Sequence, residues 1–400
     1  MSLIERAQEL QPDLVRLRRS LHREPELGLV LPRTQEKVLT ALEGLPLEIT
    51  LGRDLSSVTA VLRGGREGGA VLLRGDMDAL PVTERSGVDY ASRTPGAMHA
   101  CGHDLHTAGL VGAATLLAER RESLRGDVVF MFQPGEEGHN GASAMIAEGV
   151  LDAAGKPLDA AYALHVAANR LPGGVVATRP GTVTSASDTL TVTVRGRGGH
   201  GSSPCGALDP VPVACEIVTA IQTWVTRRFD IFDPVVVTVG SFHAGTQANV
   251  IPETAEFRAT VRSYSEAAHE RLIEGLPRLV RRIAAAHGAE AEADYAVMYP
   301  VTVNEPGEAA FALGTARELF GPAQAFQAPD PANGSEDFAF VLRHTPGAML
   351  LVGAVPEGID ADTAPMNHAP EAVFDDRVLH RQAALLATLA ERRLALGAAA

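Results

Sequence analysis

The first part of the chain alternates short apolar stretches with segments whose apolar residues recur at helical spacing. Leu3 to Leu21 follow a period of three to four residues behind Ser2-Leu-Ile-Glu5, a pattern typical of a helix capping box. Buried strands are predicted over 70–74, 127–132 and 160–165. This alternation favours an α/β fold with a doubly wound, mostly parallel sheet, in which ligands lie beyond the carboxyl ends of the strands.

The pattern changes after Pro180, where residues 189–196 alternate threonine with aliphatic residues, as in a half-exposed strand. The elements predicted from there are a helix over 211–228, strands over 235–242 and 254–263, a helix over 265–287 and a strand over 291–299. That order, β-α-β-β-α-β, is the ferredoxin-like arrangement. Its sheet has a free edge that could pair with a second copy of the chain.

The α/β pattern resumes towards the end of the chain. A helix is predicted over 308–320, and Ser335 is expected to cap a further helix with Glu336 and Asp337 in its first turn. An amphipathic helix from 377 closes the chain, with a frayed end over 394–400. We therefore expect a catalytic domain in two parts, 1–180 and 297–400, interrupted by an inserted domain over 181–296.

Composition excludes several classes of protein. Acidic residues outnumber basic ones by 49 to 35 in the 400 residues, and the resulting net charge of −14 argues against a nucleic-acid partner. The 46% of hydrophobic residues include no run of membrane-spanning length. The N-terminus has no signal-peptide pattern, and three cysteines are too few for a disulfide framework, so a cytoplasmic location is expected.

Two stretches contain the candidate chemistry. Residues 98–106 hold a thiol, three imidazoles and a carboxylate, and Glu136-Glu137 follow the strand over 127–132. Sulfur and nitrogen donors beside a carboxylate indicate a transition-metal site rather than calcium or magnesium. The pair Cys101 and His103 alone could equally be a buried structural cysteine and a capping histidine. A cysteine nucleophile with a distant histidine is a further alternative, but it leaves the two carboxylates unexplained.

The adjacent glutamates suggest two different roles. If the backbone there is extended, their side chains point in opposite directions, so that one can bind metal while the other acts as a general base towards water. We assign Glu137 as the ligand and Glu136 as the base, although spacing alone does not decide between them. Taken alone, His165 and His368 would be structural histidines, but together with Cys101, His103 and Glu137 they join the donor set. Asp76 and Asp78 are loop caps or orient the ligands, and His106 is expected to be a bystander.

Five motifs in order resemble the amidohydrolase branch of the aminoacylase and carboxypeptidase family of metallopeptidases, which includes hippurate hydrolases, N-acyl-amino-acid amidohydrolases and indole-acetyl-amino-acid hydrolases. The resemblance covers nearly the whole chain. The motifs are Gly75-Asp-Met-Asp-Ala-Leu-Pro81, Cys101-Gly-His-Asp104, Gln133-Pro-Gly-Glu-Glu137, Gly198-Gly-His200 and Asn367-His368. Where the wider family has a metal-binding histidine, this chain has Asp76, so Cys101 is expected to replace that histidine as a metal ligand.

The resemblance implies a centre of two divalent metal ions in a homodimer. It assigns Glu136 as the general base, Asp78 as the carboxylate behind the ligands, and His200 as a residue that stabilises the oxyanion in the partner protomer's site. Asn249 and Arg262 match positions that hold the substrate's carboxylate, although a turn residue and a surface arginine are their alternatives. The metal ligands that it implies are Cys101, His103, Glu137, His165 and His368.

The expected activity is hydrolysis of the amide bond of N-acyl or N-aroyl amino acids, giving a carboxylic acid and a free amino acid. Zinc suits the mixed donors, and manganese, cobalt or nickel could also serve. The alternatives are a metal-dependent carboxypeptidase or dipeptidase, and a non-catalytic binding protein on the same fold. The general base Glu136 argues against the binding protein, which would have no use for it.

Overall fold

The computed structural model describes residues 1–397 and divides the chain into two compact units. The first comprises 1–183, 303–330 and 337–400, and the second 184–302 and 331–336. The insert was predicted over 181–296, and the long segment of the second unit begins at Thr184 and ends at Thr302. The last three residues of the frayed end predicted over 394–400 lie outside the described residues, and no helix in residues 1–397 is long and apolar enough to cross a membrane.

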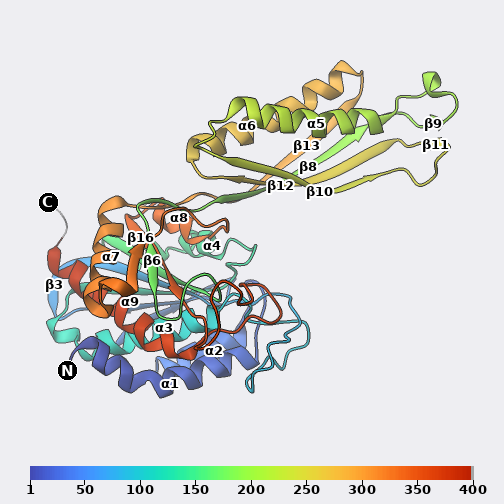
Figure 1. Ribbon diagram of the computed structural model, residues 1–400. Coiled ribbons are helices and arrows are strands. Elements are labelled where there is room, and N and C mark those ends of the chain that lie inside the picture. Colours follow the sequence, from blue (N-terminus) through green and yellow to red (C-terminus); the bar gives the residue numbers. More distant parts are fainter. Residues whose placement is uncertain (398–400) are drawn as a thin grey trace. The chain divides into compact units, whose positions relative to one another are not determined.

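An eight-stranded mixed sheet forms the centre of the first unit (Figure 1), which confirms the predicted α/β class. The neighbouring strands β4, β3, β5 and β16 are parallel to one another, while β1 and β2 continue the sheet in antiparallel pairs. In spatial order the strands are β1 (Leu47–Leu51), β2 (Val58–Leu62), β4 (Arg125–Gln133), β3 (Arg66–Asp76), β5 (Ala160–Ala167), β16 (Gly347–Gly353), β6 (Val176–Thr178) and β15 (Ala325–Gln327).

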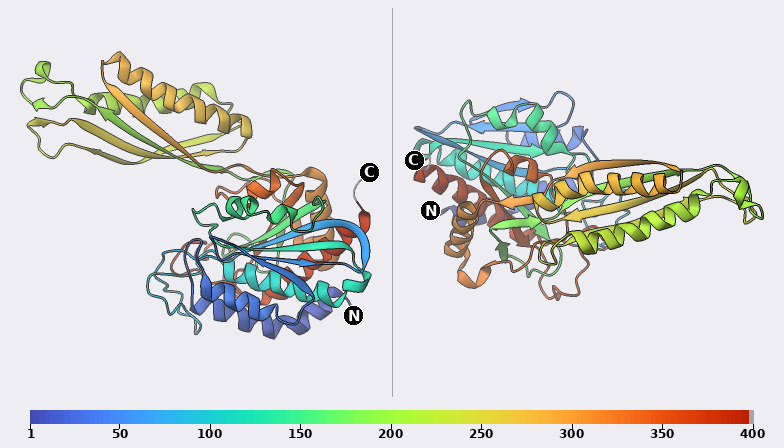
Figure 2. Two further views of the ribbon diagram at one scale, coloured as in Figure 1. Left: turned by 180° about the vertical axis from the view of Figure 1, so that it is seen from behind. Right: turned by 90° about the horizontal axis from the view of Figure 1, so that it is seen from above.

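Helices cover both faces of this sheet (Figure 2). The apolar helix α3 (His103–Glu119) packs between α1 (Leu3–Arg23) and α9 (Leu379–Leu396) on one face. A Cβ at Gly112 would lie 2.7 Å from the Cβ of Ala383, so glycine is what allows α3 and α9 to approach so closely. The remaining helices are α2 (Pro32–Ala41) and α7 (Pro306–Phe320), and on the other face α4 (Gly141–Ala147) and α8 (Phe338–Leu342).

The ends of these helices test the local predictions. The Ser2 capping box is confirmed, since Ser2 and Glu5 each bond the other's backbone N–H. The prediction for Ser335 is wrong, because α8 begins at Phe338 after Asp337. Asp337 is instead buried and accepts hydrogen bonds from Arg74 and Gln133. The Asp337 carboxylate therefore forms a long-range ion pair instead of lying in the first turn of a helix.

The second unit has the β-α-β-β-α-β order, with a sheet whose strands run β10–β12–β8–β13 and are antiparallel throughout. Alternate residues of β12, including Phe257 and Val261, are buried on one face. The elements are β8 (Ala186–Arg195), α5 (Pro210–Arg228), β10 (Val235–Ala244), β12 (Thr254–Ser263), α6 (Glu266–Ala286) and β13 (Glu290–Tyr299), with β9 (Gly199–His200) paired to β11 (Val250–Ile251).

A buried carboxylate links the sheet of the second unit to α6. Asp188 accepts hydrogen bonds from the His269 ring and the Tyr295 hydroxyl, both at 2.8 Å, and from the backbone N–H of Met298 at 3.2 Å. Burial opposes protonation of His269, but the neighbouring Asp188 outweighs it and raises the pKa of His269 from 6.5 to about 9. The histidine is therefore cationic in the folded protein near neutral pH.

This pair predicts a pH-dependent stability. Because the pKa of His269 is higher in the folded state, its contribution is fully present below pH 6.5 and is lost as the pH rises through about 9. The free energy of unfolding should fall by up to about 3 kcal/mol over that window, at about 1.4 kcal/mol per pKa unit. Urea denaturation at several pH values measures it. His269→Gln should flatten the profile, and the control His344→Gln, at an exposed position, should not. Parallel profiles for all three proteins would contradict the prediction.

Candidate metal centre

The strands of the first unit deliver the candidate donors to one place. Asp76 ends β3, His165 lies near the end of β5, and Glu136 and Glu137 follow β4. His103 is the first residue of α3, directly after Gly102, whose φ of +80° turns the chain into the helix. His368 also has a positive φ of +72°, and its backbone N–H donates to the carbonyl of Ala100. The loops at the carboxyl edge of the sheet therefore form the cluster.

Cys101 is the buried centre of one half of the cluster. Its Sγ lies 3.4 Å from His165 Nε2 and 3.3 Å from His368 Nε2. His368 Nε2 also lies 3.2 Å from Glu137 Oε1. Burial disfavours the thiolate, but His165 and the other adjacent imidazoles outweigh it and hold the pKa of Cys101 well below its usual range. Its bonds with Cys101 and Glu137 raise the pKa of His368 to about 10.

His103 is the centre of the other half. Its Nε2 lies 3.6 Å from Asp76 Oδ2 and 3.9 Å from both Glu136 Oε2 and Glu137 Oε1. Burial lowers the pKa of His103, but Asp76 and Asp78 outweigh it and hold that pKa well above its usual range. Within residues 1–397 this fully buried nitrogen makes no hydrogen bond. Buried nitrogen without a partner is costly, and a cation among these oxygens would satisfy it.

The histidine rings are oriented for ligation through Nε2. His165 Nδ1 donates to the carbonyl of Val166 at 2.9 Å, which leaves Nε2 with its lone pair towards Cys101. His103 Nδ1 lies 3.3 Å from Asp78 Oδ1, and Asp78 also accepts from the backbone N–H groups of Glu136 and Glu137 at 3.0 Å each. Carboxylates and carbonyls behind ligating histidines fix the ring and raise its basicity. The chain therefore fits a metal centre.

Two expectations about this region are corrected. Glu136 and Glu137 lie in a turn closed by a bond from Gly138 N–H to the Glu136 carbonyl, so the backbone is not extended there. His106 is not a bystander, because its Nε2 accepts from Val166 N–H at 2.8 Å and its Nδ1 therefore donates to Asp76 Oδ1 at 2.5 Å. His106 thus connects the ends of β3 and β5 beneath the donors.

A cation beneath the site was not predicted from the sequence. Arg74 is buried and its guanidinium lies 2.5 Å from Asp76 Oδ2 and 2.9 Å from Asp337 Oδ1. Its Nε also donates to Gln133 Oε1 at 2.9 Å. With His106 on the other oxygen, Asp76 is fully engaged and orients the site. The position of Arg74 directly before the Gly75-Asp76 motif is the one feature of the sequence that indicates this role.

Arg74→Met should lower the free energy of unfolding by about 3–5 kcal/mol, because it leaves the carboxylates of Asp76 and Asp337 buried without their cation. Urea denaturation of the metal-free protein measures the loss. The matched control is Arg125→Met, at the exposed start of β4, which should stay within about 0.5 kcal/mol. Equal losses in both variants would refute the role given to Arg74.

The other predicted residues belong to the second unit. His200 pairs with Val250 between β9 and β11, and Asn249 lies beside it, with its carbonyl accepting from Gly201 N–H. Arg262 lies on β12, where its Nη1 is buried and makes no hydrogen bond to any residue of 1–397. The structure therefore brings together the five predicted ligands, Glu136 and Asp78, and separately places His200 next to Asn249.

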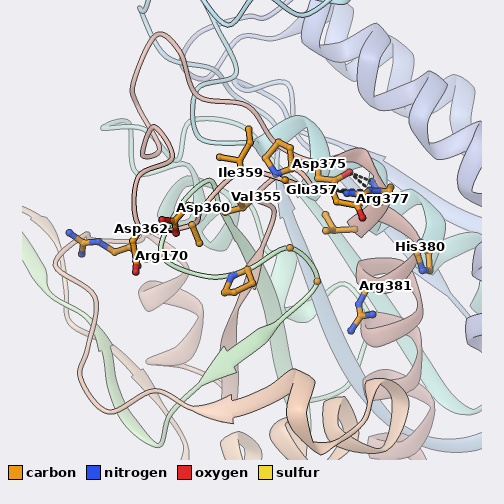
Figure 3. A pocket seen from close by; sticks show the side chains of 17 residues that line it. Arg170, Val355, Glu357, Ile359, Asp360, Asp362, Asp375, Arg377, His380 and Arg381 are labelled. Atoms are coloured by element: carbon orange, nitrogen blue, oxygen red, sulfur yellow. Dashed lines mark hydrogen bonds and ion pairs between the residues drawn. The ribbon is translucent and has the colours of Figure 1, made fainter.

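A large pocket of the first unit lies elsewhere. Its volume is about 770 Å³, and none of the predicted donors lines it. Figure 3 shows its charged side chains, among which Arg377 pairs with Glu357 and Asp375. We therefore place the chemistry at the donor cluster and not in this pocket.

A doubly wound α/β unit with clustered thiol, imidazole and carboxylate donors is typical of a metal-dependent enzyme. The chain belongs to the peptidase family M20/M25/M40, whose family profile matches residues 72–392. It is accordingly a hydrolase of amide bonds.

Three comparisons support this family. Thermostable carboxypeptidase 2 of Saccharolobus solfataricus is 33% identical over 398 residues, 98% of each chain. N-acetylcysteine deacetylase of Bacillus subtilis is 35% identical over 347 residues, which are 85% of this chain and 88% of that protein. The solved structure of Bacillus subtilis YxeP, a dinuclear metal-binding peptidase of the M20 family, has a TM-score of 0.82 at 30% identity and covers 97% of this chain and 99% of its own.

Proposed function

We propose that the protein hydrolyses N-acyl or N-aroyl amino acids to a carboxylic acid and a free amino acid, in the cytoplasm. The observation that supports this most directly is the donor cluster with Glu136 beside it, within 3.9 Å of His103 Nε2. The likeness to N-acetylcysteine deacetylase favours acyl amino acids. Arg262, with a buried guanidinium nitrogen that makes no hydrogen bond within residues 1–397, suits a substrate carboxylate.

The metal ions would be held by Cys101, His103, Glu137, His165 and His368. When bound, divalent ions polarise the amide carbonyl and acidify water, and zinc, manganese, cobalt or nickel fits these donors.

The remaining steps belong to the chain's own side chains. Glu136 takes a proton from the attacking water as the new C–O bond forms, and delivers it to the nitrogen as the C–N bond breaks. His200 Nδ1 accepts a hydrogen bond from Ser202 N–H at 3.2 Å, so Nε2 holds the proton of the neutral ring. We propose that this Nε2–H donates to the oxyanion in the partner protomer's site. Asn249 and Arg262 would hold the free carboxylate.

A carboxypeptidase is the second candidate, favoured by the 33% identity to thermostable carboxypeptidase 2 over nearly the whole chain. Metal analysis followed by hydrolysis of N-acetyl amino acids, N-benzoyl amino acids and dipeptides separates the two functions. Methyl esters of the same compounds are the matched control, since they lack the carboxylate and should react poorly in either case. Activity on dipeptides alone would favour the carboxypeptidase, and a metal-replete protein inactive on every substrate would refute both.

We also propose that the protein is a homodimer paired through the edge strand β10. The loop before β10 exposes 84% of Ile231 and 90% of Phe232, and Val236 on the strand is half exposed. Such apolar groups beside an open sheet edge are typical of an interface.

Ile231→Ser with Phe232→Ser should convert the dimer to a monomer, as measured by sedimentation velocity. The matched control is Ile359→Ser, at an exposed position of the first unit, and it should leave the dimer intact. A wild-type protein that sediments as a monomer at all concentrations would refute the proposal.

A further inference from the structure

A groove between α5 and α6 gathers positive charge in a chain whose net charge is −14. Its volume is about 620 Å³, within the range of small-ligand sites. None of its lining residues is acidic, and five of the eight are arginines: Trp224, Arg227, Arg228, Arg271, Gly275, Arg278, Leu279 and Arg282.

Helical spacing builds this groove. Arg271, Gly275, Arg278 and Arg282 stand at positions i, i+4, i+7 and i+11 and so form one stripe of α6, about 16 Å long. A Cβ at Gly275 would lie 2.4 Å from the ring of Trp224, so the absent side chain lets the α5 indole settle against α6. The groove is therefore a consequence of the packing between the two helices.

The charge in this groove is uncompensated. Within residues 1–397 no carboxylate forms an ion pair with any of the five arginines, and Arg271 instead donates to the carbonyl of Arg228 at 2.7 Å. The α5 dipole explains Arg227 and Arg228, which lie in its last turn. The α6 dipole does not explain Arg271 and Arg278, because both residues precede the last turn of α6. In the pocket of Figure 3, by contrast, Arg377 is paired with carboxylates.

We propose that this groove, which nothing above links to the amide-bond chemistry, binds a small oligophosphate, a row of two or more phosphate groups. A guanidinium grips phosphate through two parallel hydrogen bonds. Five guanidiniums offer more donors than one phosphate can accept, and the stripe on α6 is long enough for a row. An inorganic oligophosphate and the phosphates of a nucleotide present the same chemistry to the arginines.

Titration calorimetry of the full chain in 150 mM salt, with inorganic triphosphate, adenosine triphosphate and orthophosphate, tests the proposal. Arg278→Gln with Arg282→Gln should weaken triphosphate binding at least about tenfold, because two charge-assisted bonds are lost. Arg258→Gln with Arg281→Gln removes the same charge from exposed positions outside the groove, and should change affinity less than about twofold. Both variants should keep wild-type amidase activity.

The possible results separate clearly. Equal affinity for the two triphosphates would assign recognition to the phosphates alone, and tighter binding of the nucleotide would add contacts to the base, both in support. Absence of saturable binding to wild type, or an equal loss in the two double variants, would overturn the proposal. So would binding of a single-stranded oligonucleotide without binding of triphosphate.

Discussion

The Glu136→Gln variant should retain its metal ions, and its kcat should fall by a factor of about 10² to 10⁴. The amide keeps the shape of the side chain but cannot accept the proton of the attacking water. Glu136 lies 3.9 Å from His103 Nε2, and its assignment as the base rather than as a ligand predicts this combination. Steady-state kinetics on an N-acyl amino acid and elemental analysis of the same preparation measure the two quantities. A variant that kept most of its activity would show that Glu136 is not the base.

Glu137→Gln is the matched comparison, since it makes the same chemical change at the next residue. Its carboxylate lies 3.2 Å from His368 Nε2 and near His103, so we expect its loss to lower the metal content as well as the activity. If Glu136→Gln lost metal and Glu137→Gln kept it, the two roles would be exchanged. This experiment decides what the adjacent positions in the sequence could not.

Removal of the metal ions by a chelator should abolish activity, and zinc, manganese, cobalt or nickel should restore it. It should also lower the unfolding temperature, because ions that bind only the folded state stabilise it. Elemental analysis before and after dialysis, with thermal unfolding in parallel, provides the measurement. Full activity in verified metal-free protein would favour Cys101 as a nucleophile instead.

Much of this structure follows from sequence patterns of short range. Period-two alternation predicted β8, and the predicted bounds of β12, α5 and α6 lie within one residue of the observed ones. The resemblance carried by five motifs implied the donor set, and Cys101, His103, Glu137, His165 and His368 do lie together. Their roles as ligands remain predictions that the metal analysis will test.

What the sequence did not reveal depends on contacts between distant segments. Arg74 and Asp337 are 263 positions apart, so neither the strand pattern around the arginine nor the cap pattern around Ser335 announced a buried ion pair. His106 was predicted to be a bystander because its partners, Asp76 on β3 and Val166 on β5, lie far from it in the sequence. A polar residue inside a core is explained only when its partner is known.

The order of the donors along the chain has a consequence for biogenesis. His368 lies 267 positions after Cys101, and it reaches the thiol of Cys101 after the intervening second unit has been made. A ribosome therefore synthesises the whole second unit before the imidazole of His368 exists. Loading of the complete centre must follow translation, so a nascent chain stalled before that codon would lack this imidazole donor.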